Sequence, residues 1–138
     1  SESGLAVPDF PTSGGALIPT FDDRMLTYSN NILKVFGKEP VTFSQILIHL
    51  LHRFFAFVVL ALAVINYLFM RRAASLNINL VRHGYYIFAG VLIQMFLGVM
   101  VVFSLKFHIL TSTHVVIGAM ILALCLCLVL RLLSLKKA

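Results

Sequence analysis

Four ionisable side chains stand inside otherwise apolar stretches of the sequence: His49, His52, Arg53 and His114. Ionisable groups are costly within a membrane, so such residues predict a function. A neutral imidazole can ligate iron through one ring nitrogen, and two imidazoles on opposite faces of a heme complete its axial coordination. An arginine guanidinium can pair with a carboxylate, such as a heme propionate. These residue types favour a heme-binding site, provided that the surrounding elements bring two histidines together.

The composition predicts that those elements are membrane helices. Of the 138 residues, 60% are hydrophobic and only 12% are charged, whereas soluble domains carry roughly 25% charged residues. Too little polar surface remains to cover a water-soluble globule, so the fold class is an all-α integral membrane protein. The net charge of +6 comes mostly from basic residues at helix ends. Nucleic acid is therefore not expected as a partner, and the lipid bilayer is.

Three long apolar segments predict transmembrane helices at about residues 41–70, 84–105 and 109–133. Each holds about 20 residues or more, enough to cross a hydrocarbon core roughly 30 Å thick. Residues 1–40 form a separate polar segment, with all four prolines and all five acidic residues. We expect it to be an extramembrane loop with a short amphipathic helix near residues 25–36. Cys125 and Cys127 are spaced to point to different sides of a helix, so a disulfide between them is not expected.

Positive charge at helix ends also predicts the topology. Basic residues cluster in the link between the first two apolar segments and at the C-terminus, as Arg71, Arg72, Arg82, Arg131, Lys136 and Lys137. The positive-inside rule places both regions in the cytoplasm or matrix and residues 1–40 on the outer face. We expect a multi-pass protein of the bacterial inner membrane or the mitochondrial inner membrane. Export of the N-terminal segment without a visible signal further predicts a transmembrane helix before Ser1.

This topology brings two histidines to similar depth. His52 lies about 9–13 Å inward from the outer end of its helix, and His114 lies about 8–9 Å inward on the third segment. The first and third segments run in the same direction, so the two imidazoles can face each other in a bundle core, where heme sites are built. The sequence therefore predicts His52 and His114 as axial ligands of one heme iron.

Small and polar neighbours complete the predicted site. Ala56 and Gly118 each lie one turn after a predicted ligand, where a small side chain would let a flat macrocycle approach. Arg53 is expected to contact a propionate. Gln94, one turn before Gly98, indicates either a close helix contact or a hydrogen bond to the cofactor.

His49 leaves several interpretations open. It stands about one turn before His52 on the same helix face, about 4.5 Å along the axis. It could ligate a metal, move a proton or lie at the membrane interface. Because one face of a heme needs one ligand, we expect that His49 does not bind the iron.

Four motifs in order resemble the heme A synthase family. Residues 3–11 (SGLAVPDFP), followed by Gly14-Gly15 and residues 17–19 (LIP), resemble the family's first outer loop. Residues 52–56 (HRFFA) resemble its "HRxxA" motif, residues 94–98 (QMFLG) its "QxxLG" motif, and residues 114–116 (HVV) the start of its fourth helix. The resemblance implies eight transmembrane helices in two four-helix halves, each with a histidine pair. The chain resembles one half without its first helix.

The chain departs from this pattern at the expected catalytic position. The family's catalytic half has a glutamate three residues before the histidine of "HR", where this chain has His49. Phe10 replaces a tryptophan, and Val7 and Ser13 stand where some members have a cysteine pair. The resemblance thus implies heme binding more strongly than it implies oxidation of a heme methyl group, and the catalytic residues stay unassigned.

Three functions remain in competition. The first is an oxidoreductase of heme A formation, with a b-type heme that supplies electrons. The second is a non-catalytic subunit that holds a b-type heme in a larger respiratory complex. The third is a heme-free scaffold subunit. In each, other membrane subunits or a second copy of the chain are the expected partners.

Overall fold

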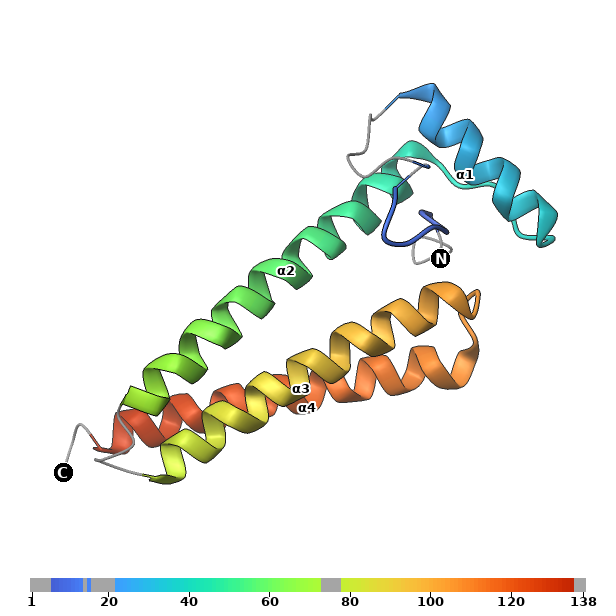
Figure 1. The fold of residues 1–138 in the computed structure, drawn as a ribbon. Helices are drawn as coiled ribbons and strands as arrows, with labels where there is room; N and C mark the ends of the chain where they lie inside the picture. The colour runs from blue at the N-terminus through green and yellow to red at the C-terminus, as the bar shows by residue number, and fades with distance from the viewer. Residues whose placement is uncertain (1–5, 14, 16–21, 73–77, 136–138) are drawn as a thin grey trace. The chain divides into compact units, whose positions relative to one another are not determined.

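The computed structural model describes residues 6–13, 15, 22–72 and 78–135, and its regular elements in these ranges are α-helices (Figure 1). They are α1 (Asp23–Val35), α2 (Phe43–Arg72), α3 (Ile78–Phe103) and α4 (His108–Leu135). The all-α fold expected from the sequence is confirmed. The predicted amphipathic helix near residues 25–36 corresponds to α1.

Local signals explain the bounds of α1. The carboxylate of Asp22 caps its first turn by accepting a hydrogen bond from the Met25 backbone N–H at 3.1 Å, which satisfies an otherwise free donor. The helix stops before Gly37, whose φ of +64° suits a residue without a side chain. The Lys38 backbone N–H then donates to the Leu33 carbonyl at 2.9 Å and closes the C-terminal turn.

Helix α1 is fixed to the start of α2 by one asparagine and a small apolar core. Asn30 accepts a hydrogen bond from the Val41 backbone N–H at 2.7 Å and donates to the Val41 carbonyl at 3.2 Å. One face of α1 packs on Val41, Ile46 and the N-terminal segment. The buried cluster consists of Ala6, Val7, Met25, Leu33, Val41 and Ile46. The polar segment is therefore a folded part of the molecule, packed against the first turns of α2.

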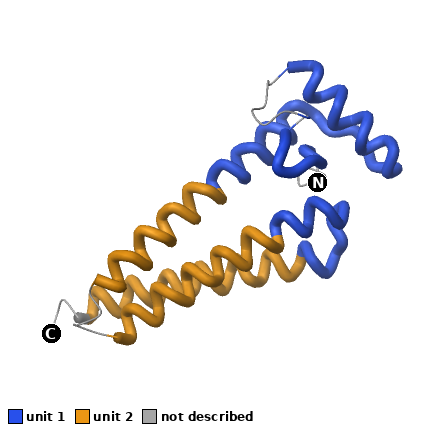
Figure 2. The backbone as a smooth tube through the Cα atoms, viewed as in Figure 1, with its two compact units in different colours: residues 1–55, 98–111 blue, residues 56–97, 112–138 orange. Residues whose placement is uncertain are grey.

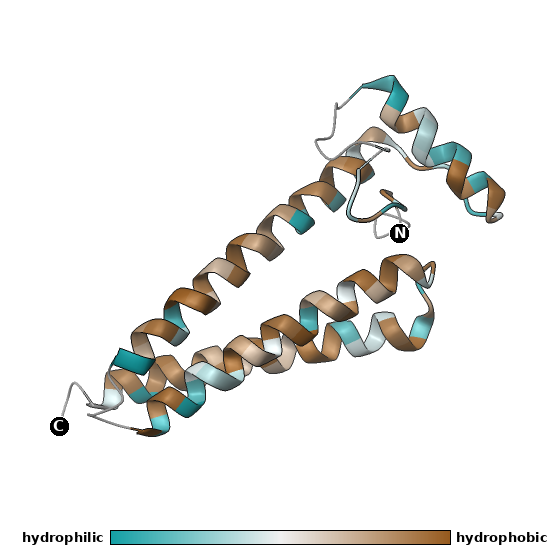
Figure 3. Ribbon diagram, in the orientation of Figure 1, coloured by the Kyte–Doolittle hydropathy of each residue, from teal (hydrophilic) through white to brown (hydrophobic). Residues whose placement is uncertain are grey.

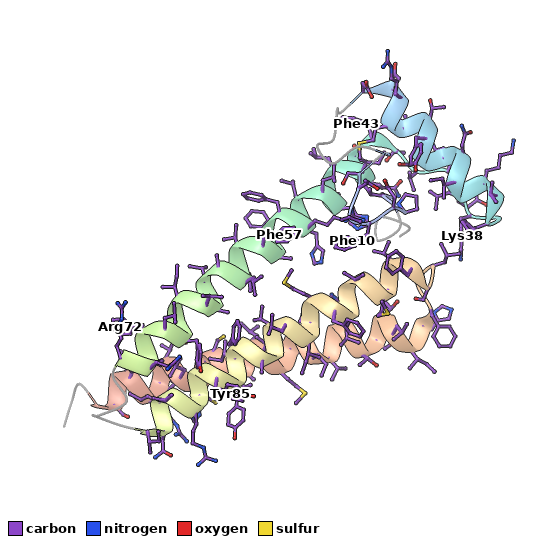
Figure 4. All side chains as sticks on the ribbon, viewed as in Figure 1. Phe10, Lys38, Phe43, Phe57, Arg72 and Tyr85 are labelled. Carbon is purple, nitrogen blue, oxygen red and sulfur yellow. The ribbon has the colours of Figure 1, made fainter. Side chains whose placement is uncertain are left out.

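Helices α2, α3 and α4 are long and apolar enough to cross a membrane, with 30, 26 and 28 residues. Figure 3 shows hydrophobic residues along all three. Most of their large apolar side chains are exposed, as Phe57 illustrates in Figure 4, which fits contact with lipid. Helix α3 begins at Ile78, six residues before the predicted start at residue 84, because the apolar residues Leu80 and Val81 continue the helical face.

The chain divides into two compact units, each described by itself (Figure 2). Unit 1 comprises residues 1–55 and 98–111, and unit 2 comprises residues 56–97 and 112–138. In unit 1, the turn between α3 and α4 is tight. Leu105 and Lys106 adopt φ values of +52° and +63°, and the Ser104 hydroxyl accepts a hydrogen bond from the Phe107 backbone N–H at 3.2 Å.

Small residues let the helices of unit 2 approach closely. A Cβ atom added to Gly84 would lie 3.1 Å from the side chain of Met70, and one added to Gly90 would lie 3.0 Å from the side chain of Ile121. Close approach through small residues is typical of membrane helix contacts. A buried cluster also links the three helix segments of this unit; it comprises Met70, Leu80, Ile87 and Leu128.

If α2, α3 and α4 each cross the membrane once, the two ends of the described chain lie on opposite sides of it. We expect single cysteines at the exposed positions Thr27 and Ser134, in a background lacking Cys125 and Cys127, to differ in accessibility. In sealed vesicles, a membrane-impermeant maleimide should label one of them, and the other only after permeabilisation. Labelling of both from one face would contradict the three-helix topology.

Candidate functional site

In unit 1, the guanidinium of Arg53 binds the N-terminal segment to α2. One terminal nitrogen donates to the carbonyls of Val7 and Asp9, at 2.9 and 2.8 Å. The other donates to the Thr12 carbonyl at 3.1 Å and to the Ser13 hydroxyl at 3.4 Å. These contacts match the four N–H groups of the two terminal nitrogens and leave only Nε–H for another partner. The predicted propionate contact of Arg53 stays a prediction.

Phe10 contributes apolar packing to the same arrangement (Figure 4). Its ring lies 5.6 Å from the Arg53 guanidinium carbon, a cation–π distance. The ring of Phe103, at the end of α3, meets Phe10 edge-on, with centroids 6.4 Å apart. The N-terminal segment is thus held against both α2 and the end of α3 in unit 1. We call residues 6–13 with their contacts to His49 and Arg53 the loop brace.

His49 belongs to the loop brace. Its side chain is only 6% exposed, and its Nδ1 accepts a hydrogen bond from the Val7 backbone N–H at 3.2 Å. A neutral imidazole that accepts at Nδ1 carries its hydrogen on Nε2. The Nε2 atom then lacks the free lone pair that an iron ligand needs. This geometry supports the expectation that His49 is not an iron ligand, which nevertheless remains to be tested.

In unit 2, His114 and Gln94 lie in contact across α4 and α3. The Gln94 amide nitrogen donates to the His114 carbonyl at 3.0 Å and lies 3.2 Å from His114 Nε2. A flipped amide would set its oxygen against that carbonyl, so the nitrogen must face His114. It can then donate to Nε2 only if this atom is the acceptor, with the ring hydrogen on Nδ1. An iron-ligating imidazole needs this same lone pair on Nε2.

The space at Gly118 is occupied by Gln94. A Cβ atom added to Gly118 would lie 3.0 Å from the Gln94 amide nitrogen, which is closer than most Cβ atoms in proteins approach a neighbouring atom. From the sequence we expected the small side chain of Gly118 to make room for a macrocycle. In unit 2 the Gln94 side chain lies in that space. The Gln94 Oε1 atom is buried and has no hydrogen-bond partner among the described residues.

The structure thus groups the predicted residues in two places. Arg53 and His49 lie together in unit 1, and Gln94 and His114 lie together in unit 2. His52 is an exposed residue of α2 in unit 1, so its pairing with His114 stays a prediction. Sequence reasoning missed the loop brace, because backbone carbonyls that capture a guanidinium leave no signature in residue types.

Among the residues that the structure describes, no group of three or more His, Cys, Asp and Glu side chains could hold a bare metal ion. A heme makes a smaller demand on the protein, because the porphyrin supplies four of the six iron ligands and the chain supplies the axial ones. The donor set present, neutral imidazoles on long apolar helices, fits that demand.

Comparison with known proteins assigns the family. Residues 1–126 match the COX15-CtaA family, described as cytochrome oxidase assembly protein. No curated protein and no solved structure matches the chain. The matched range includes the loop brace, His52, His114 and Gln94. The chain therefore belongs to the COX15-CtaA family, the heme A synthase family.

Proposed function

We propose that this protein binds one b-type heme between its transmembrane helices, through His52 and His114, and serves heme A formation or the associated electron transfer. The family supports a heme A synthase-like role in cytochrome oxidase assembly. The observation that carries the proposal is the contact between His114 and Gln94, which selects the imidazole tautomer that an iron ligand needs.

The positions of the two histidines along their own helices agree with this proposal. His52 lies nine residues after the start of α2, and His114 six residues after the start of α4. At 1.5 Å per residue these spacings correspond to about 13 Å and about 9 Å. The difference is about one helical turn, which imidazole side chains can bridge. A six-coordinate heme with two histidines has no open site for oxygen, so when bound it would transfer electrons.

The protein's own residues would prepare this site. Gln94 lies against His114 Nε2, the atom that would hold the iron, and its bond to the His114 carbonyl would not conflict with that role. Second contacts of this kind orient ligands and typically change metal affinity 10- to 100-fold, as a rough guide.

A non-catalytic b-type heme subunit is the second candidate, and His49 favours it. The family resemblance places a catalytic glutamate at this position. Here the imidazole is buried and accepts a hydrogen bond from Val7, so it stabilises the loop brace instead of facing a substrate. In either role we place residues 1–40 on the outer face of a bacterial or mitochondrial inner membrane. Other membrane subunits or a second copy would complete the assembly.

Replacing either axial histidine should abolish the low-spin heme. We expect His52→Ala and His114→Ala to lower heme per chain by at least about tenfold, since loss of a mere supporting contact already costs that much. Any residual heme should be five-coordinate and high-spin. The pyridine hemochrome spectrum of the purified full chain gives heme type and content, and electron paramagnetic resonance gives the spin state.

His49→Gln is the matched control for these variants. It removes the other imidazole of α2 while keeping a side chain that can accept the Val7 hydrogen bond. Heme content and the low-spin signal should stay at the level of the unaltered protein. Loss of heme in this variant alone would transfer the ligand role to His49. Retention of heme in both alanine variants would refute the axial pair.

Arg53 should act chiefly on the loop brace. We expect Arg53→Ala to lower the free energy of unfolding by about 2–4 kcal/mol, because several charge-assisted hydrogen bonds are lost and their acceptors stay partly buried. Hydrogen–deuterium exchange should show faster exchange in residues 6–13. The exposed Arg24 provides the control, and Arg24→Ala should leave this exchange unchanged. Unchanged exchange in the Arg53 variant would contradict the bracing role.

A double-mutant cycle tests whether Gly118 makes room for the Gln94 side chain or for another group. The added methyl of Gly118→Ala meets the Gln94 amide, so we expect a loss of about 1–3 kcal/mol from overpacking. Gln94→Ala removes that amide, and the double variant should recover most of this loss in thermal unfolding. Additive effects would show that Gly118 makes room for something other than Gln94.

A further inference from the structure

The sequence leaves a cluster of basic residues in unit 2 without any acidic counterpart in the same part of the chain. All five acidic residues lie within residues 1–40, so residues 41–138 contain neither Asp nor Glu. Arg71 and Arg72 end α2, and Arg82 follows at the start of α3. All three are exposed. No hydrogen bond or ion pair joins them to another residue within the described ranges. No side-chain carboxylate within residues 41–138 balances their positive charge.

Aromatic rings organise this cluster. Tyr67 stacks on Phe88 with ring centroids 5.5 Å apart and planes 9° from parallel, and Tyr85 lies 6.4 Å from Tyr67. The Arg71 guanidinium carbon lies 5.9 Å from the centre of the Tyr67 ring. A cation–π contact uses the flat face of the guanidinium. It fixes the position of Arg71 and leaves the N–H groups on its edge free to donate.

The helix spacing brings the remaining groups to this end of unit 2. Tyr85 and Tyr86 lie three and four residues after Arg82, so all three are neighbours on α3. Both tyrosines are about half exposed, at 52% and 47%, and Figure 4 shows Tyr85 projecting from α3 and Arg72 from the end of α2. Tyrosines at the end of an apolar span are typical of the membrane–water interface.

We propose that Arg71, Arg72, Arg82 and the tyrosines beside them form a binding site for the phosphate of an anionic phospholipid. Planar guanidinium groups donate two parallel hydrogen bonds to phosphate oxygens. The exposed tyrosine hydroxyls can donate at headgroup level, and the apolar surface of α2 and α3 accepts the acyl chains. The occupant is a lipid and not a soluble anion, because the cations lie where the apolar spans end.

Spin-labelled lipids test this site in the full chain, with its heme content unaltered. The protein is reconstituted in phosphatidylcholine bilayers that contain trace spin-labelled phosphatidylglycerol or phosphatidylcholine, and the motionally restricted fraction is measured for each. A cation near an anionic lipid strengthens binding roughly fivefold. We expect phosphatidylglycerol to be preferred by about fivefold or more, and Arg71→Gln/Arg72→Gln to remove most of the preference.

Two further variants distinguish a built site from general charge attraction. Lys34→Gln/Lys38→Gln removes the same net charge from the region of α1 and should keep the preference. Tyr67→Leu keeps every charge but removes the cation–π platform, and it should weaken the preference about twofold to threefold. Free inorganic phosphate at millimolar concentration should not compete.

Three results would overturn the proposal. If the arginine and lysine double variants lost the preference for phosphatidylglycerol equally, the preference would come from net charge alone. Competition by free phosphate would show that the cations bind a soluble anion. No preference for phosphatidylglycerol in the unaltered protein would leave an acidic segment of a partner protein as the counterpart of these arginines.

Discussion

The structure of unit 1 depends on satisfying one guanidinium within an apolar helix. Arg53 has no acidic residue within its own membrane segments, since residues 41–138 contain none. The cost of removing its guanidinium from water is offset by hydrogen bonds to oxygen atoms of the polar N-terminal segment, at 2.8 to 3.4 Å. Removing either side of this contact leaves buried polar groups without partners, which is expensive in a membrane. The loop and the helix therefore specify each other's position.

In unit 2 the interior polar groups form a neutral pair, in which the Gln94 Oε1 atom has no hydrogen-bond partner among the described residues. Gln94 bonds both the carbonyl and the ring of His114, so one amide satisfies two acceptors on α4. This requires the helices to be close, and Gly118 provides the necessary space. Interhelical bonds of this type contribute modestly to membrane protein stability, about 0.6 kcal/mol on average. Their greater effect here is to fix which nitrogen of the imidazole carries the lone pair.

The sequence predicted the fold better than the roles of the individual residues. Apolar length predicted α2, α3 and α4 because crossing a bilayer demands it. The start of α3 was placed late, because Arg82 and His83 resembled a loop although Leu80 and Val81 continue the helix. Gly118 was interpreted from its neighbour His114 on the same helix, whereas its actual contact comes from α3. Such contacts depend on helix rotation and register, which composition and spacing do not determine.

The histidines show how environment divides roles among chemically identical side chains. His49 accepts a backbone hydrogen bond at Nδ1 and so holds its hydrogen on Nε2. His114 faces an amide donor at Nε2 and so holds its hydrogen on Nδ1. Only the second state presents a lone pair at Nε2, and in the first state the Nδ1 lone pair is taken by the Val7 N–H. The imidazole at residue 49 is thus engaged by the backbone of the loop brace, through the Val7 N–H. The two side chains are therefore not interchangeable: His49 holds the loop brace in unit 1, and His114 pairs with Gln94 in unit 2.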